Sequence, residues 1–132
     1  MTQQIATTPE QGKRLLACGV DPKSADFVWM EDKPNPRLTL RTEIIEDSNP
    51  YIVGYGWSLG RLLAMLPQDL MWQGLYYRLV MGPNEYGWEI EYNDLSVLNN
   101  LHRVGAENLI DAVVYLIEWL TEEKYKLNEI SK

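Results

Sequence analysis

Apolar residues recur at helical spacing near the end of the chain. After Gly105 the apolar positions lie three and four residues apart, and acidic residues fall mostly between them. The apolar positions are Leu109, Val113, Leu116, Ile117 and Leu120. A stripe of this kind is typical of an amphipathic helix that buries one face and leaves the other in water. We therefore predict the longest helix of the protein in this stretch.

Two shorter helices carry recognisable start or stop signals. Thr8 stands before a proline and three positions before Gln11, which is the pattern of a capping box at a helix start. Gly12 then weakens this helix by about 1 kcal/mol relative to alanine, so the helix needs packing to persist. Ser58 caps a second helix whose leucines lie at spacings of three and four, and Pro67 ends it.

Alternation of apolar and polar residues with a period of two predicts two β-hairpins. In the first hairpin, residues 27–30 pair with residues 38–44 across a proline-containing loop. In the second, residues 75–81 pair with residues 88–92 across a loop at 82–87. Both hairpins are bounded by glycine, proline or asparagine, which favour turns over regular structure.

The last strand of the second hairpin alternates large apolar residues with glutamates. We expect the apolar side chains to face the core and Glu89 and Glu91 to face water, where Arg78 is placed to pair with them across the strands. Residues 95–104 suit either a further strand or a turn of helix, and the sequence leaves both interpretations open.

The predicted order is helix, two strands, helix, two or three strands, helix. Consecutive hairpins favour an antiparallel sheet with about three helices packed on one face, which is an α+β fold. A chain of 132 residues has the length for one hydrophobic core. We therefore expect a single domain over residues 1–132, with residues 1–7 forming a flexible N-terminus.

The charge of the chain argues against polyanionic partners. Twelve basic and nineteen acidic residues give a net charge of -7. Residues 1–41 hold six basic and five acidic residues, giving +1, whereas residues 42–132 hold six and fourteen, giving -8. Such a surface repels nucleic acid and anionic membranes. No apolar stretch is long enough to span a bilayer. The first residues do not show the basic segment followed by an apolar segment that is typical of a secretory signal. We therefore expect a cytoplasmic protein.

The sequence contains no recognisable catalytic constellation. Cys18 and His102 are the single cysteine and the single histidine, which excludes a disulfide framework and a zinc site built from such residues. Neither a nucleophile elbow nor a phosphate-binding loop with its lysine is present. Glu89 and Glu91 share one predicted strand face, but two equally solvated carboxylates have similar pKa values. One of them would therefore not act as an acid while the other acts as a base. We expect no enzyme activity, no cofactor and no metal.

The aromatic composition is the one feature that points to binding. Five Trp and eight Tyr stand against one Phe, so almost every aromatic ring carries a polar group. Rings of this kind are enriched at interfaces and in ligand grooves. The candidate binding residues are Tyr51, Tyr55 and Trp57 in an expected loop over 50–58, Trp72 after the second helix, and Tyr86 at the tip of the second hairpin.

Two stretches carry a resemblance to known proteins. One runs from Thr8 through Leu16 into Gly19-Val20-Asp21 and Ser24-Ala25-Asp26, and the other runs from Trp57 to Pro67, with support from Ile117 to Leu127. Together they resemble a family of small α+β proteins of anaerobic gut bacteria and of their prophages and mobile elements. The resemblance implies a cytosolic accessory protein with no assigned activity, and it carries over no site residue.

These observations favour a non-catalytic accessory or assembly protein that binds a protein partner or a second copy of itself. One alternative is a small-molecule or carbohydrate binder that uses the Trp and Tyr rings as a stacking platform. Another is an acidic inhibitor of a DNA-acting enzyme, because an acidic surface can occupy a site built for DNA.

Overall fold

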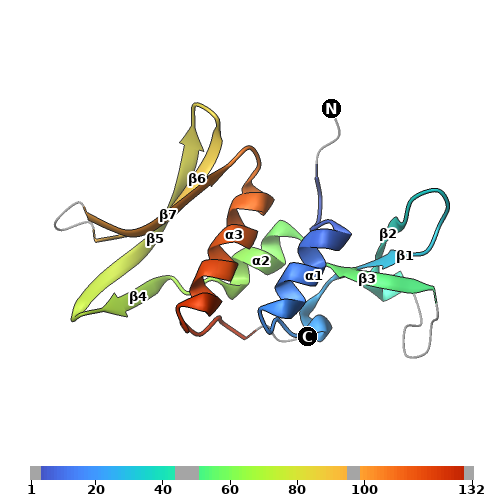
Figure 1. Ribbon diagram of the computed structural model, residues 1–132, viewed down its shortest axis with the longest axis horizontal. Helices are drawn as coiled ribbons and strands as arrows, with labels where there is room; N and C mark the ends of the chain where they lie inside the picture. Colours follow the sequence, from blue (N-terminus) through green and yellow to red (C-terminus); the bar gives the residue numbers. More distant parts are fainter. Residues whose placement is uncertain (1–3, 44–50, 95–98, 130–132) are drawn as a thin grey trace.

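Three helices form the middle of the molecule, and a β-sheet lies on either side of them (Figure 1). The computed structural model describes residues 4–43, 51–94 and 99–129. The helices are α1 (Pro9–Ala17), α2 (Leu59–Met65) and α3 (Leu109–Glu122), with 3-10 turns at η1 (Pro22–Ser24) and η2 (Arg41–Glu43). None of the helices in these described ranges is long and apolar enough to cross a membrane.

The strands form two antiparallel sheets. One sheet has the order β2-β1-β3 and consists of β1 (Phe27–Met30), β2 (Arg37–Leu40) and β3 (Ile52–Gly56). The other has the order β4-β5-β6-β7 and consists of β4 (Asp69–Trp72), β5 (Leu75–Asn84), β6 (Gly87–Asp94) and β7 (Asn99–Ala106). The predicted α+β class is confirmed, and both predicted hairpins form, but their strands belong to separate sheets.

The helix start signals act as the sequence predicts. Gln11 N donates a hydrogen bond to Thr8 Oγ1 (3.1 Å), and Thr8 N donates one to Gln11 Oε1 (3.0 Å), which completes the capping box of α1. Ser58 accepts a hydrogen bond from Arg61 N at the start of α2. The predicted stripe of α3 is buried against the core from Val113 to Leu120, and Leu109 is partly buried. These features depend on neighbouring residues alone, which is why the sequence shows them.

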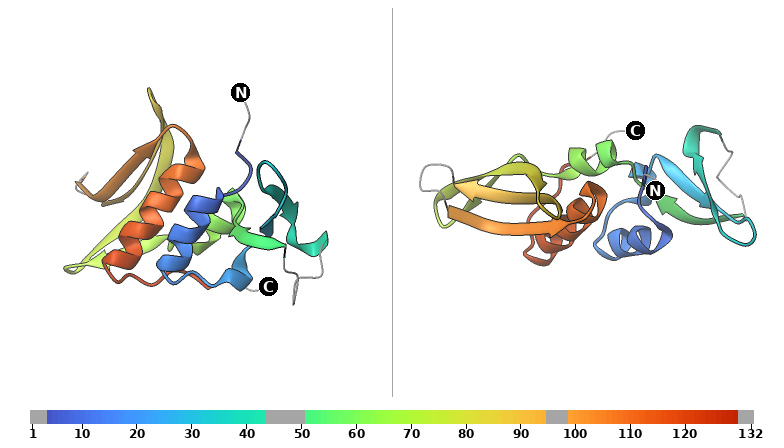
Figure 2. Two further views of the ribbon diagram at one scale, coloured as in Figure 1. Left: turned by 45° about the vertical axis from the view of Figure 1, so that its right-hand side comes forward. Right: turned by 90° about the horizontal axis from the view of Figure 1, so that it is seen from above.

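A single cluster of buried side chains joins the three helices to the four-stranded sheet. Helix α3 lies along one face of this sheet, and no helix of the described chain lies on the other face (Figure 2). Helices α1 and α3 meet through polar groups as well: Arg14 makes a bidentate pair with Glu118 (3.0 and 2.5 Å), and Gln11 donates to Asp111. These two acidic side chains therefore contact α1 instead of pointing away from the core.

Part of the segment 1–7, which the sequence led us to expect as a flexible N-terminus, is bonded to the rest of the protein. Thr7 is buried, and its N–H donates to Trp57 O (2.9 Å) while its hydroxyl accepts from Trp57 N (3.0 Å). The indole N–H of Trp29 donates to Thr7 O (3.0 Å). The chain before α1 is held by these bonds, and residues 1–3 lie outside the described residues.

The predicted strand boundaries need three corrections. The strand predicted over 38–44 ends at Leu40, because the chain turns into η2, and residues 44–50 lie outside the described residues. The loop predicted over 82–87 shrinks to Glu85 and Tyr86, since β5 continues through Pro83. The open question at 95–104 resolves into a strand from residue 99 onward, and residues 95–98 are not described.

The two glutamates of β6 lie in different surroundings. Ile90 and Tyr92 are buried as predicted, whereas Trp88, also predicted to face the core, is exposed. Glu91 is only 8% exposed instead of facing water. The register places Glu91 opposite Arg103 of β7, whose Nε lies 2.7 Å from the carboxylate. The ion pair and the neighbouring strands cover the carboxylate, because cross-strand partners on one face of a sheet stand close together.

Candidate functional site

The hairpin of β4 and β5 projects from the four-stranded sheet beyond the helices (Figure 1). Its two connecting residues, Gln73 and Gly74, both have positive φ (51° and 79°). A two-residue connection of this kind is the tight turn that right-twisted strands favour. Trp72 stands opposite Leu75 in the register, so the strands remain paired up to the turn.

Large apolar side chains cover both faces of this projecting tip. The register pairs Met71 with Tyr76 and Trp72 with Leu75, and successive pairs point to opposite faces. All four side chains are exposed, by 44–65%. Exposed apolar groups are common singly, whereas several of them close together are typical of interaction surfaces. We call these four residues the hairpin tip.

The base of the hairpin is anchored, which keeps the tip in place. Leu70 and Tyr77 are paired across the strands and are buried in the core. On the opposite face, Arg78 Nε lies 3.4 Å from Asp69 Oδ1. This pairing corrects the prediction for Arg78: its side chain pairs with β4 and not with the glutamates of β6. The local charges at the base thus neutralise each other.

Strand β4 is an edge of its sheet, because the strand order begins with it. Leu79 N donates to Gln68 O (2.9 Å), and hydrogen-bonded pairs alternate along an antiparallel ladder. The backbone groups of Leu70 and Trp72 therefore face β5, whereas those of Met71 face outward. The described chain places no strand beside this edge. Strand β4 contains no proline, no lysine and no bulge, which are the usual features that keep an edge strand from pairing with another chain.

The five binding residues predicted from the sequence do not form one surface. Tyr51 and Tyr86 are exposed, but they lie at the three-stranded sheet and at the β5–β6 connection. Trp72 belongs to the hairpin tip, while Tyr55 lies in β3 and is half-buried. Trp57 is fully buried, at 0% exposure, and carries no surface at all. The expected loop over 50–58 is therefore largely a strand.

Contacts with neighbouring segments explain why the ring of Tyr55 is half-buried and that of Trp57 is buried. The guanidinium of Arg41 lies over the Tyr55 ring, 5.4 Å from its centroid. The indole N–H of Trp57 donates to Ser24 Oγ (2.9 Å), so the polar group of this ring is satisfied inside the protein. Buried tryptophans usually find such a partner, which is why a polar aromatic ring does not by itself indicate a surface.

Three residues of the hairpin tip, Met71, Leu75 and Tyr76, were missed as site residues by the sequence analysis. A short sequence pattern could have identified them. Two apolar runs stand on either side of Gln73-Gly74, and a two-residue connection ending in glycine between such runs is a hairpin signature.

A second group of rings surrounds Trp119 of α3. The rings of His102 and Trp119 stack in parallel, with 4.2 Å between centroids, and Tyr125 lies 5.6 Å from Trp119. Burial of the imidazole beside these rings lowers the pKa of His102, and the nearby Glu123 opposes this only in part. Burial also raises the pKa of Tyr92, whose hydroxyl donates to Pro67 O (2.7 Å). These rings fix β7 and the chain after α3 to the core.

We expect the stability of the protein to fall as His102 becomes protonated. Because the folded state lowers this pKa, the unfolded state binds the proton first, and the free energy of unfolding decreases as the pH falls below about 6.5. The variant His102→Gln should lose this part of the pH dependence. NMR titration of the single histidine measures the pKa directly, and a value at or above 6.5 would contradict the prediction.

No arrangement of the described residues resembles a metal centre, since no three His, Cys, Asp or Glu side chains in these ranges come together as ligands would. His102 lies on β7, and Cys18 lies at the end of α1, where it is half-buried. Comparison of the chain with protein-family models, with curated proteins and with solved structures found no match. The resemblance to accessory proteins of gut bacteria stays a prediction.

Proposed function

We propose that the protein is a non-catalytic binding module that holds an extended segment of a partner protein against its β4–β5 hairpin. One observation carries the proposal: the hairpin tip exposes large apolar side chains on both faces, beside a sheet edge along which the described chain places no further strand. We place this role in the cytoplasm, because a chain with a single cysteine gains no disulfide from an oxidising compartment.

Strand addition fits this arrangement better than a flat contact does. A segment laid along β4 would hydrogen-bond to the outward N–H and C=O of Met71, which gives affinity without regard to sequence. Its alternate side chains would then contact Trp72 and Leu75 on one face and Met71 and Tyr76 on the other. Side-chain pockets on alternating positions supply specificity in this mode of recognition.

A different protein is the better partner than a second copy of the chain. Each copy carries a net charge of -7 over the whole chain, and the like net charges oppose the approach of two copies. A basic or neutral partner meets no such repulsion. The hairpin itself adds no charge, because Asp69 and Arg78 already pair within one copy.

Variants of two exposed tyrosines on the same sheet test the surface. We expect Tyr76→Ser at the hairpin tip to weaken binding of the purified partner about tenfold, because interface tyrosines often contribute more than 1 kcal/mol. Tyr86→Ser, at the β5–β6 connection, removes another exposed ring and should leave binding unchanged. Partners are identified by comparing proteins retained from lysate by the two variants, and the affinity is then measured by calorimetry.

Two outcomes contradict the proposal. One is a partner that binds both tyrosine variants equally well, which removes the hairpin from the interface. The other is a doubling of the solution mass that Tyr76→Ser abolishes, which would make the occupant a second copy.

A backbone variant separates strand addition from side-chain contact alone. Met71→Pro removes the outward N–H and leaves the hydrogen bonds to β5 in place, because proline is tolerated where an edge N–H faces solvent. Met71→Ala removes the side chain and keeps the N–H. If strand addition is correct, the proline variant loses more affinity than the alanine variant while both keep the circular dichroism spectrum of the parent protein. Equal losses would restrict the contact to side chains.

A further inference from the structure

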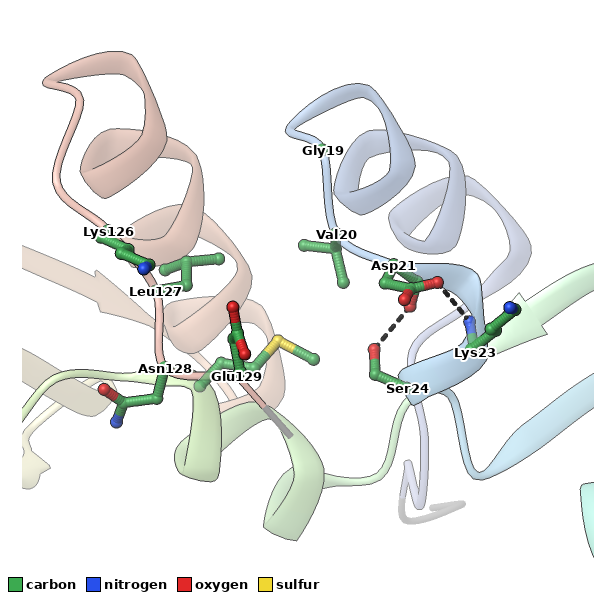
Figure 3. Close-up of a pocket in the computed structure, with 10 residues that line it drawn as sticks. Gly19, Val20, Asp21, Lys23, Ser24, Lys126, Leu127, Asn128 and Glu129 are labelled. Carbon is green, nitrogen blue, oxygen red and sulfur yellow. Dashed lines mark hydrogen bonds between the residues drawn. The ribbon is translucent and has the colours of Figure 1, made fainter. Parts of the chain in front are cut away.

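A pocket of about 510 Å³ lies where two turns face each other (Figure 3). One wall is the turn from Gly19 to Ser24 that follows α1, and the other is the chain from Lys126 to Glu129 that follows α3. Met65 of α2 lines the space between them. The volume is within the range of small-molecule sites.

Both walls are held by hydrogen bonds of their own. In the first wall, Val20 N donates to Leu15 O (3.1 Å), and Gly19 takes the positive φ of 92° that ends α1. In the second wall, Asn128 N donates to Met65 O (2.9 Å), and its side-chain amide donates to Leu66 O (3.0 Å). The pocket is therefore formed before any ligand arrives, which lowers the entropy cost of binding.

The groups that face the pocket are of two kinds. Val20 and Leu127 point toward each other from opposite walls, while the carboxylate of Glu129 reaches into the space between them (Figure 3). Lys126 lies on the rim beside Leu127, whereas Lys23 points away from the space (Figure 3). The wall from Lys126 to Glu129 thus presents apolar surface with one acidic and one basic group. The opposite wall adds Asp21, whose carboxylate accepts a hydrogen bond from Lys23 N (2.9 Å).

Neither Lys126 nor Glu129 is neutralised within the described chain. The ion pairs there join other residues, and no described carboxylate lies within 4.0 Å of the Lys126 ammonium. Glu129 and Lys126 do not pair with each other either. An acidic and a basic group that stay apart, with apolar surface beside them, complement a ligand that carries both charges and an apolar group.

We propose that this pocket binds a small zwitterion with an apolar group, of the amino-acid type. The ligand's ammonium group binds Glu129, its carboxylate binds Lys126, and its apolar group lies between Val20 and Leu127. The site is separate from the hairpin surface, and neither proposal depends on the other.

Trp57 provides a signal for binding at this pocket. Ser24 lines the pocket, accepts the indole N–H of Trp57 (2.9 Å) and donates its own proton to Asp21 O (2.6 Å). A ligand that contacts this wall changes the surroundings of the Ser24 hydroxyl and therefore the NMR signal of the Trp57 indole. Trp72 and Trp88, in the four-stranded sheet, serve as internal controls.

The experiment compares three probes with one apolar body and different charges. L-phenylalanine carries both charges, phenethylamine carries the positive charge, and 3-phenylpropionate carries the negative charge. We expect L-phenylalanine to shift the Trp57 indole signal saturably with the highest affinity of the three, while the signals of Trp72 and Trp88 stay in place. Equal affinities for the three probes, or no saturable shift at millimolar concentrations, would overturn the proposal.

Variants assign each charge to its residue. Lys126→Met should weaken the binding of L-phenylalanine roughly tenfold, which is the usual effect of losing a charge-assisted hydrogen bond. The binding of phenethylamine should be unchanged. Glu129→Gln should weaken both of these probes. Lys23→Met is the matched control, because this lysine borders the same pocket but points away from it (Figure 3). A loss of binding in the control equal to that of Lys126→Met would refute the assignment.

Discussion

Replacing Trp57 with alanine is expected to lower the free energy of unfolding by about 3–5 kcal/mol, the usual loss for a large buried ring. The side chain is 0% exposed, so its whole volume becomes a cavity. The substitution also leaves Ser24 Oγ without the indole N–H that it accepts. Since small domains are stable by only about 5–15 kcal/mol, this single change removes a large part of the total.

The same substitution at an exposed tryptophan is the control. Trp72→Ala removes a ring from the hairpin tip that is 44% exposed, and we expect it to change the free energy of unfolding by less than about 1 kcal/mol. Urea unfolding followed by circular dichroism measures both variants. Equal losses at the two positions would contradict the assignment of Trp57 to the core. The comparison also shows why an interface must be tested at Trp72 or Tyr76, because a change at Trp57 acts on folding.

Features that depend on neighbouring residues could be predicted from the sequence. The capping box at Thr8 and Gln11, the cap at Ser58 and the apolar stripe of α3 all lie within a few residues of the backbone groups that they satisfy. Local hydrogen bonds and helical spacing decide these elements. The two hairpins follow from the same kind of information, because period-two alternation and turn residues are visible along the chain.

Features that depend on packing between distant segments could not be predicted. The short run of Asp69 to Trp72 shows no alternation, because Met71 and Trp72 are both apolar and are exposed on opposite faces, although Leu70 is buried. Burial of Glu91 depends on Arg103 of the next strand, and burial of Trp57 depends on Ser24 and Thr7. An isolated sequence shows the residues but not these partners.

The candidate sites also depend on packing between distant segments more than on neighbouring residues. Of the five binding residues predicted from composition, the structure places one, Trp72, in the hairpin tip. The property that makes this tip a candidate site is the exposure of apolar side chains on both faces beside a sheet edge, which depends on how the strands pack and pair. The pocket beside Val20 and Leu127 likewise depends on two turns far apart in the sequence. Aromatic composition led to the expectation of a binding surface, and the proposed positions of the two sites rest on the fold.

Replacing Gly12 with alanine is expected to destabilise the protein, although alanine is the better helix former. Helix α1 crosses β3 so closely that a Cβ on Gly12 would collide with the backbone oxygen of Tyr55. This neighbour is backbone in a paired strand and cannot swing aside as a flexible side chain could. Overpacking at such a contact costs about 1–3 kcal/mol, which exceeds the gain of about 1 kcal/mol that helix propensity alone would give.

A matched glycine separates the contact from the propensity. Gly60 also lies in a helix, α2, but the nearest atom to a Cβ there is Ser58 Oγ at 3.9 Å, an ordinary contact. We therefore expect Gly60→Ala to raise the melting temperature and Gly12→Ala to lower it, as measured by calorimetry. A rise in both variants would show that α1 does not press against β3. Opposite signs would show that the glycine which weakens α1 as an isolated helix is the residue that allows it to pack.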